Sequence, residues 1–113
     1  MYAYVRCCSI LEKKKPNLDK NLDKNELLKN YDLLSKIINF PIYLEKFTSE
    51  RSPHSLVHFT KELAANYHSF YERNSVITDN QEESNARLLI TKATSIVLKN
   101  SFKIIGVTPL EKM

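Results

Sequence analysis

The chain has 113 residues, of which 42% are hydrophobic and 27% are charged, and its formal net charge is +4. This length and balance predict one soluble globular domain over residues 1–113. No apolar run reaches the roughly 20 residues of a membrane span, and no signal-peptide pattern is present. The single glycine excludes glycine-rich phosphate-binding loops. The positive charge suits a polyanionic partner but does not identify one.

The first predicted element is a helix over about residues 2–14. Tyr4, Cys7, Cys8 and Leu11 are spaced so that they share one helical face. Adjacent cysteines rarely bridge each other, and they lack the spacing of metal ligands. We interpret them as small hydrophobic residues in a reducing compartment, which predicts a cytoplasmic location.

A loop is predicted around residues 14–24, where Pro16 ends the first helix and the tetrapeptide Asn-Leu-Asp-Lys occurs twice. We expect this stretch to be disordered or loop-like. Asp23 followed by Glu26 predicts a capping box at the start of a second helix. The apolar stripe of this helix consists of Leu27, Leu28, Tyr31, Leu34, Ile37 and Ile38.

Three further helices are predicted from their end signals. Pro41 suits the first position of a short third helix, and Ser52 followed by proline predicts a fourth helix over residues 53–73. A fifth helix over 83–105 ends at Gly106. Because no segment alternates with period two, the predicted fold is all-α, a bundle of four or five helices. The predicted core-facing residues of these helices are Ile42, Leu44 and Phe47; Leu56, Phe59, Leu63, Tyr67, Phe70 and Tyr71; and Ala86, Ile90, Ala93, Val97 and Ile104.

No residue pattern indicates a catalytic centre. His54, His58 and Glu62 share one helix face and have the spacing of metal ligands, but no fourth ligand joins them. A solvated helix face is the preferred interpretation. Serine, histidine and aspartate occur in no arrangement that activates a nucleophile.

Two patterns are suited to nucleic acid. Lys92, Lys99 and Lys103 form a row on the fifth helix that can follow a phosphate backbone, although from charge alone a solvated face is the preferred interpretation. Tyr67 and Tyr71 lie one turn apart at the edge of an apolar stripe. Tyrosine rings stack on bases, and the alternative is that both rings pack in the core.

The sequence resembles the C-terminal, DALR-type anticodon-binding domain of class I arginyl-tRNA synthetases. Residues 2–10 resemble the helix that opens this domain, and 55–71 resemble its helix with a leucine-alanine pair and a closing Phe-Tyr. Ala86-Arg87-Leu88 and Val97 to Asn100 match the next helix, and 105–113 resembles the family's terminus. Tyr4, Ser101 and Lys112 depart from the common pattern, and Lys112 cannot make the bidentate contact of an arginine.

The resemblance implies a domain that holds the anticodon stem-loop of tRNA-Arg. By resemblance, Tyr2 and Arg6 lie near the loop, while Tyr67, Tyr71 and the terminal Met113 contact anticodon nucleotides. We add Lys99 and Lys103 as candidate backbone contacts. The implied parent is a monomeric, ATP- and magnesium-dependent arginine–tRNA ligase whose catalytic domain is a partner. This domain alone has no cofactor and no activity.

Two alternatives remain open at this point. One is a helical protein–protein interaction module, for which we expect an exposed apolar surface and binding that depends weakly on salt. The other is the related helical domain of another class I synthetase, such as the cysteinyl enzyme, although the C-terminal motif argues against it.

Overall fold

A computed structural model describes residues 2–17, 23–49 and 53–106. The described residues form six helices and no strand, which confirms the all-α fold and corrects the predicted number of helices. The helices are α1 (Tyr2–Lys13), α2 (Lys24–Lys29), α3 (Tyr31–Ile38), α4 (Phe40–Ser49), α5 (Pro53–Arg73) and α6 (Gln81–Ile105). Among these helices, none has the length and apolar character needed to cross a bilayer.

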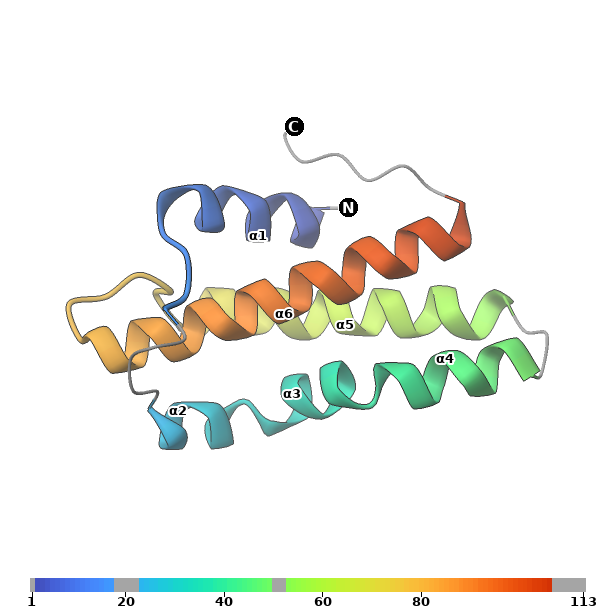
Figure 1. The fold of residues 1–113 in the computed structure, drawn as a ribbon, viewed down its shortest axis with the longest axis horizontal. Coiled ribbons are helices and arrows are strands. Elements are labelled where there is room, and N and C mark those ends of the chain that lie inside the picture. Colours follow the sequence, from blue (N-terminus) through green and yellow to red (C-terminus); the bar gives the residue numbers. More distant parts are fainter. Residues whose placement is uncertain (1, 18–22, 50–52, 107–113) are drawn as a thin grey trace.

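The helices pack in three layers (Figure 1). The long helices α5 and α6 lie side by side in the middle, and α1 packs against both of them from one side. On the other side α2, α3 and α4 follow one another in a row, with α2 against α6 and α4 against α5. The surface of α5 therefore borders α1 on one flank and α3 and α4 on the other.

The central helix is α6, which contacts α1, α2, α3 and α5. It buries residues on several sides, including polar ones, and this distribution explains why its predicted single stripe was incomplete. The hydroxyls of Thr91 and Thr94 donate to the carbonyls of Arg87 and Ile90, so they are satisfied within the core. Ile104, which was predicted to face the core, is 52% exposed.

The helix α1 is oriented by one buried face. Its buried residues are Ala3, Tyr4, Cys7 and Ile10. Cys8 and Leu11 were predicted on this face but are only half-buried, so the face is rotated toward Ala3 and Ile10. Both cysteines are free thiols, as expected from their adjacency.

The helix α5 has the predicted bounds and the predicted apolar side. All residues of that side are buried except Tyr71, which is half-buried at the border with α1. Because α5 packs against α1, α3, α4 and α6, its remaining face is the one exposed to solvent.

The start of α2 was predicted only in part. The carboxylate of Asp23 accepts hydrogen bonds from the backbone N–H groups of Asn25 and Glu26, at 3.0 and 3.2 Å, and so caps the helix. The reciprocal half of the predicted capping box was wrong. Glu26 is buried, and its carboxylate binds Arg87 of α6 instead.

The predicted second helix is divided at Asn30 into α2 and α3. The backbone N–H of Asn30 donates to the carbonyl of Leu27, three residues back, which tightens the turn there. The division changes the direction of the predicted stripe. Leu28, Tyr31 and Ile38 are 69%, 65% and 70% exposed, so the prediction that they face the core was wrong.

The helix α4 begins at Phe40, one residue before the predicted start at Pro41. Leu44 and Phe47 pack against the core as predicted. Ile42 is 66% exposed, so its predicted role as an anchor was wrong.

Both ends of α6 are fixed by caps. The side chain of Asn80 accepts a hydrogen bond from the Glu83 N–H, so the helix begins two residues before the predicted position. Gly106 ends it, as predicted, in the left-handed conformation with φ of 92°. The predicted cap at Ser52 and residues 18–22 of the predicted loop lie outside the described residues.

Candidate nucleic-acid interface

Two tyrosines with an arginine between them lie where α1 packs against α5, with Tyr2 and Arg6 on α1 and Tyr71 on α5. We call Tyr2, Arg6 and Tyr71 the Tyr–Arg–Tyr cluster. Arg6 Nη2 donates a hydrogen bond of 2.6 Å to Tyr2 Oη. The guanidinium carbon of Arg6 lies 5.4 Å from the ring centre of Tyr2 and 4.9 Å from that of Tyr71. These distances are typical of cation–π contacts.

The outer edge of the cluster is exposed and mixed in charge. Tyr2 is 50% exposed, and its ring meets the ring of His68 edge to face at 6.0 Å between centres. His68 Nε2 lies 2.9 Å from Glu72 Oε1, one turn further along α5. The exposed ring of Tyr2 and the imidazole of His68 therefore form one continuous aromatic surface.

The charge of Arg6 is held in place by its neighbours. The hydrogen bond to Tyr2 raises the pKa of the guanidinium above its usual value, and the tyrosines nearby act in the same direction. Arg6 Nε is buried and has no hydrogen-bond partner among the described residues. The cluster thus presents a permanent positive charge between two aromatic rings.

A pocket of about 430 Å³ adjoins the cluster at the end of α5. Tyr71 and Arg73 line it from α5, Ile10 and Lys13 line it from α1, and residues 74–77 of the α5–α6 connection close it. The pocket combines an aromatic ring with two basic side chains and the carboxylate of Glu72. Its volume is within the range of sites for small ligands.

Tyr67, unlike Tyr71, belongs to the core. It is 0% exposed, and its hydroxyl lies 3.0 Å from Thr91 Oγ1. Because the Thr91 hydroxyl donates to the carbonyl of Arg87, Tyr67 is the donor to Thr91. Burial raises the pKa of Tyr67 well above its usual value. The full burial of this ring favours the alternative that Tyr67 packs in the core.

The lysine row is exposed on α6. Lys92, Lys99 and Lys103 all lie on the solvent side of this helix. Ile96, which lies between them in the sequence, is 49% exposed. Among the described residues none of the three lysines forms an ion pair, so their charges are available to a polyanion. Met113 lies outside the described residues.

Two of the three candidate metal ligands, His58 and Glu62, pair with each other, and Glu62 also pairs with Lys36. His58 Nε2 lies 2.9 Å from Glu62 Oε1, and Lys36 Nζ lies 3.6 Å from Glu62 Oε2. The described part of the chain has no group of three or more His, Cys, Asp and Glu residues that could hold a metal ion. Glu62 is thus occupied by two basic side chains, and the described residues do not fit a magnesium site.

The buried thiol of Cys7, near the face between α1 and α5, is not reactive. Desolvation raises the pKa of Cys7 to about 12, and its side chain is fully buried. A thiol that stays protonated is neither a nucleophile nor a metal ligand. The chemistry of the α1–α5 face is therefore that of a binding surface, with aromatic rings, fixed positive charge and a neighbouring pocket.

Comparison with known families identifies what kind of domain carries this face. The sequence profile described as DALR anticodon binding domain matches residues 1–113. The chain belongs to the DALR anticodon-binding domain family. The expected family is confirmed over the whole chain rather than only over the motifs quoted above.

Individual relatives of this DALR domain are arginine–tRNA ligases. The chain is 39% identical to arginine–tRNA ligase 1 of Halalkalibacterium halodurans and 39% identical to arginine–tRNA ligase of Bacillus subtilis, each over 118 residues. Both matches cover 99% of the chain and 21% of the relative, so the chain spans about a fifth of their length. The crystal structure of arginyl-tRNA synthetase from Plasmodium falciparum is similar, with a TM-score of 0.78 and 29% identity over 99% of the chain and 20% of that protein.

Proposed function

We propose that this DALR domain binds tRNA-Arg as part of an arginine–tRNA ligase, with the anticodon loop on the face between α1 and α5. The observation that carries the proposal is the Tyr–Arg–Tyr cluster, in a domain whose family is named for anticodon binding. Splayed single-stranded bases stack on aromatic rings and arginine planes, and this cluster offers both.

The positions of the other candidate residues fit this proposal to different degrees. The contacts that join Tyr2, Arg6 and Tyr71 at one surface support their proposed roles at the anticodon loop. Lys99 and Lys103 are exposed on α6 and are proposed to contact the phosphate backbone outside the loop. Met113 is retained as a proposed contact on the resemblance alone.

The remaining parts of the proposal concern the whole protein. In it, residues 1–113 form a single domain that acts with a catalytic domain of the same ligase. That catalytic domain uses ATP and magnesium, and the ligase is a cytoplasmic monomer. The relatives named above are arginine enzymes, which supports arginine rather than cysteine as the amino acid concerned.

A second candidate function is a protein–protein contact through α2, α3 and α4. Its support is the presence of several exposed apolar side chains on these helices, since interaction surfaces are often apolar. These side chains are Leu28, Tyr31, Ile38 and Ile42. Such a contact would be apolar, so its affinity would depend little on salt.

Salt dependence separates the two candidates. We would measure the affinity of the chain for a tRNA-Arg transcript at several salt concentrations, after circular dichroism shows that the chain is helical. A nucleic-acid interface predicts that log K falls linearly with log[salt], by about 0.7 to 0.9 for each phosphate neutralised. Replacing Lys99 with alanine removes a proposed phosphate contact and should reduce that slope by about one phosphate contact. A flat dependence argues against a nucleic-acid interface, and equal slopes for the Lys99→Ala variant and the parent chain argue against a phosphate contact at Lys99.

A further inference from the structure

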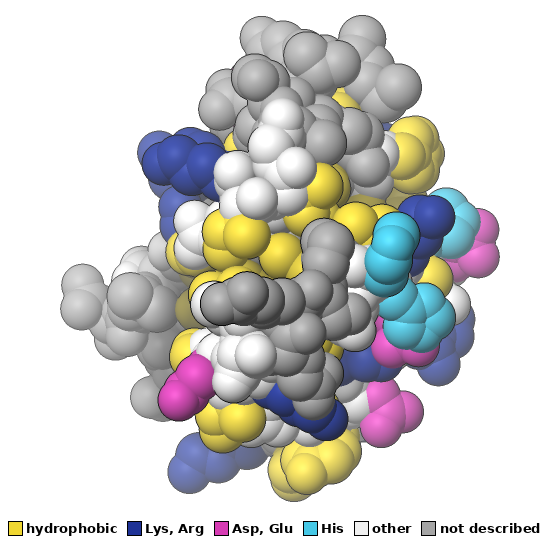
Figure 2. All heavy atoms as spheres, turned by 90° about the vertical axis from the view of Figure 1, so that its right-hand side faces the viewer, with side chains coloured by type: hydrophobic (Ala, Val, Ile, Leu, Met, Phe, Trp, Pro, Cys, Tyr) yellow, Lys and Arg dark blue, Asp and Glu magenta, His cyan; other side chains and the backbone are white. Residues whose placement is uncertain are grey.

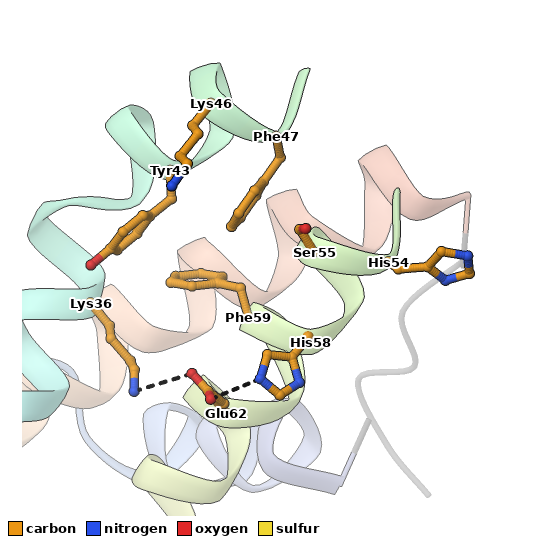
Figure 3. A pocket seen from close by; sticks show the side chains of 9 residues that line it. All are labelled: Lys36, Tyr43, Lys46, Phe47, His54, Ser55, His58, Phe59 and Glu62. Carbon is orange, nitrogen blue, oxygen red and sulfur yellow. Dashed lines mark ion pairs between the residues drawn. The ribbon is translucent and has the colours of Figure 1, made fainter. Parts of the chain in front are cut away.

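A second pocket lies on the opposite flank of α5, between α3, α4 and the N-terminal half of α5 (Figure 3). Its volume is about 450 Å³, which is in the usual range for small-ligand sites. None of the residues in the Tyr–Arg–Tyr cluster lines it. The pocket is therefore separate from the interface described above, although both use the same helix.

One wall of this pocket is aromatic. The rings of Tyr43 and Phe47 from α4 are nearly parallel, with 13° between their planes and 6.2 Å between their centres. Phe59 of α5 lies 5.3 Å from Tyr43 and 6.2 Å from Phe47, and it forms the buried floor. In Figure 3 Phe47 projects from α4 toward Phe59. Three rings thus offer an apolar surface suited to a flat ligand.

The rim of the pocket is basic. Lys36, Lys46, His54 and His58 line it together with a single carboxylate, Glu62. Glu62 lies between Lys36 and His58 in Figure 3, and each of its oxygens is engaged by one of them. No carboxylate of the described residues pairs with Lys46 or His54. The rim therefore keeps an unbalanced positive charge.

The histidines of the chain share the helix that carries part of this rim. All three histidines of the chain are on α5, and Figure 2 shows the histidines gathered on one side of the molecule. His54 and His58 are exposed at the rim of the pocket. Two of the histidines have carboxylate partners, namely His58 with Glu62 and His68 with Glu72, whereas His54 has none among the described residues.

From the rings and the charge together, we propose that the pocket between α3, α4 and α5 binds one unstacked nucleotide of an RNA strand. The base lies against Tyr43 and Phe47, and the phosphate lies at Lys46. An acidic peptide would satisfy the charge but would make no use of a row of flat rings. A base provides a π-face and a phosphate in one unit, and such sites combine aromatic stacking with a basic groove.

This second site rests on the proposed function, because the nucleotide it binds belongs to the RNA that the domain is proposed to bind. Phe59 precedes Tyr71 by twelve residues on α5, which places the two sites about 18 Å apart along the helix axis. An RNA strand of several nucleotides spans that distance. The second pocket thus adds a contact to the same RNA on the other flank of α5.

The test uses the ¹⁵N-labelled chain and an eight-nucleotide single-stranded RNA of mixed sequence, with AMP as a mononucleotide probe. We expect saturable amide shifts at residues 43–47 and 55–59 with both probes. Lys46→Ala should lower the dependence of log K on log[salt] by about 0.7 at this site, the value for one phosphate of a single strand. Phe47→Leu keeps an apolar side chain without a π-face and should weaken binding of the RNA. Lys24→Ala, at an exposed lysine of α2, is the matched control. It should change neither the salt dependence nor the affinity for the RNA.

Several results would overturn the inference. Shifts confined to α1 and the C-terminal half of α5 would leave the proposed function intact and remove this pocket from it. Equal affinity and salt dependence for Lys46→Ala and Lys24→Ala would show that the rim binds no phosphate. If a peptide rich in glutamate and phenylalanine shifts the amides of the pocket, but RNA and AMP do not, the pocket binds a protein segment rather than RNA. Conversely, Tyr71→Ala should leave the amide shifts that AMP causes in the pocket unchanged. The proposals for the two sites can therefore be contradicted separately.

Discussion

Arg87 of α6 binds Glu26 of α2 through a contact of 2.8 Å between Arg87 Nε and Glu26 Oε1, although the residues are 61 positions apart. The side chains are 12% and 3% exposed. Arg87 Nη1 also donates to the carbonyl of Ser75, at 2.7 Å, and lies 3.1 Å from Glu83 Oε1. One guanidinium therefore connects α2, α6 and the α5–α6 connection that lines the pocket beside Tyr71.

Removing this arginine is expected to destabilise the domain. Arg87→Ala leaves the Glu26 carboxylate buried without its main partner, and a broken buried pair costs about 3–5 kcal/mol. The free energy of unfolding from urea titrations measures the loss. The matched control is Arg73→Ala, an exposed arginine, for which we expect a change of about 0.5 kcal/mol or less. A double variant, Glu26→Gln with Arg87→Met, should recover part of the stability. An Arg87→Ala chain as stable as the parent would show that the pair is not a structural connection.

Stability is also expected to fall in alkali because of Cys7. Its pKa is about 12 in the folded chain, against an ordinary value of 9.0, because the thiolate would be desolvated. The unfolded state then loses its proton first, so this contribution is complete below pH 9 and is lost as the pH rises toward 12. At pH 10 the free energy of unfolding should be about 1.4 kcal/mol lower than at pH 7 from this group alone.

The measurement is urea unfolding at pH 7 and pH 10 in the presence of a reductant. Cys7→Ala lacks the thiol and should lose about 1.4 kcal/mol less than the parent between the two pH values. Cys8→Ala is the natural control, because that neighbouring thiol is half-buried. If Cys7→Ala and Cys8→Ala show the same alkaline loss, burial of Cys7 is not its cause.

The two tyrosines of α5 should respond differently to substitution. Tyr67→Phe removes the hydrogen bond to Thr91 but keeps the buried ring, so we expect a loss of about 0.5–1.5 kcal/mol in stability. RNA affinity should not change, since the ring is inaccessible. Urea unfolding and a binding titration on the same variant test both statements. Weaker RNA binding with unchanged stability would indicate that Tyr67 contacts the RNA.

Gly106 provides a test of the cap at the end of α6. An added Cβ would meet no atom within 4 Å, so Gly106→Ala acts only through the backbone at φ of 92°. The left-handed conformation costs an alanine about 1–2 kcal/mol, and asparagine tolerates it better. Thermal or urea unfolding should therefore show that the parent chain is the most stable, Gly106→Asn is less stable, and Gly106→Ala is the least stable. A stable alanine variant would mean that the helix continues past residue 106.

Local signals in the sequence were enough to predict much of the fold. The bounds and apolar side of α5 and the end of α6 at Gly106 follow from caps, proline and periodicity, which act within a few residues. The division at Asn30 and the exposure of Ile42 were missed. Short amphipathic segments do not reveal which face meets the rest of the bundle until the tertiary packing is known.

The candidate site shows the same limit. Tyr67 and Tyr71 have the same spacing signal, and only the position of α1 leaves Tyr71 at an edge while Tyr67 is enclosed. The contact of Arg6 with Tyr71 joins residues from opposite ends of the sequence, so no local pattern predicts it. The hydrogen bond from Arg87 to Glu26 was not predicted either, because the two residues are far apart in the sequence. Glu26 also had a plausible local role in the capping box.

The most direct test of the proposed interface is the affinity of the chain for the anticodon stem-loop of tRNA-Arg, measured for the parent, Tyr71→Ala and Tyr31→Ala. Tyr31 is an exposed tyrosine on α3, away from the cluster, and serves as the matched control. Loss of one base-stacking contact should weaken binding by about 1–3 kcal/mol, which is roughly 5- to 150-fold in Kd. The account predicts this loss for Tyr71→Ala only, with both variants folded. Equal affinity of the two variants would contradict it.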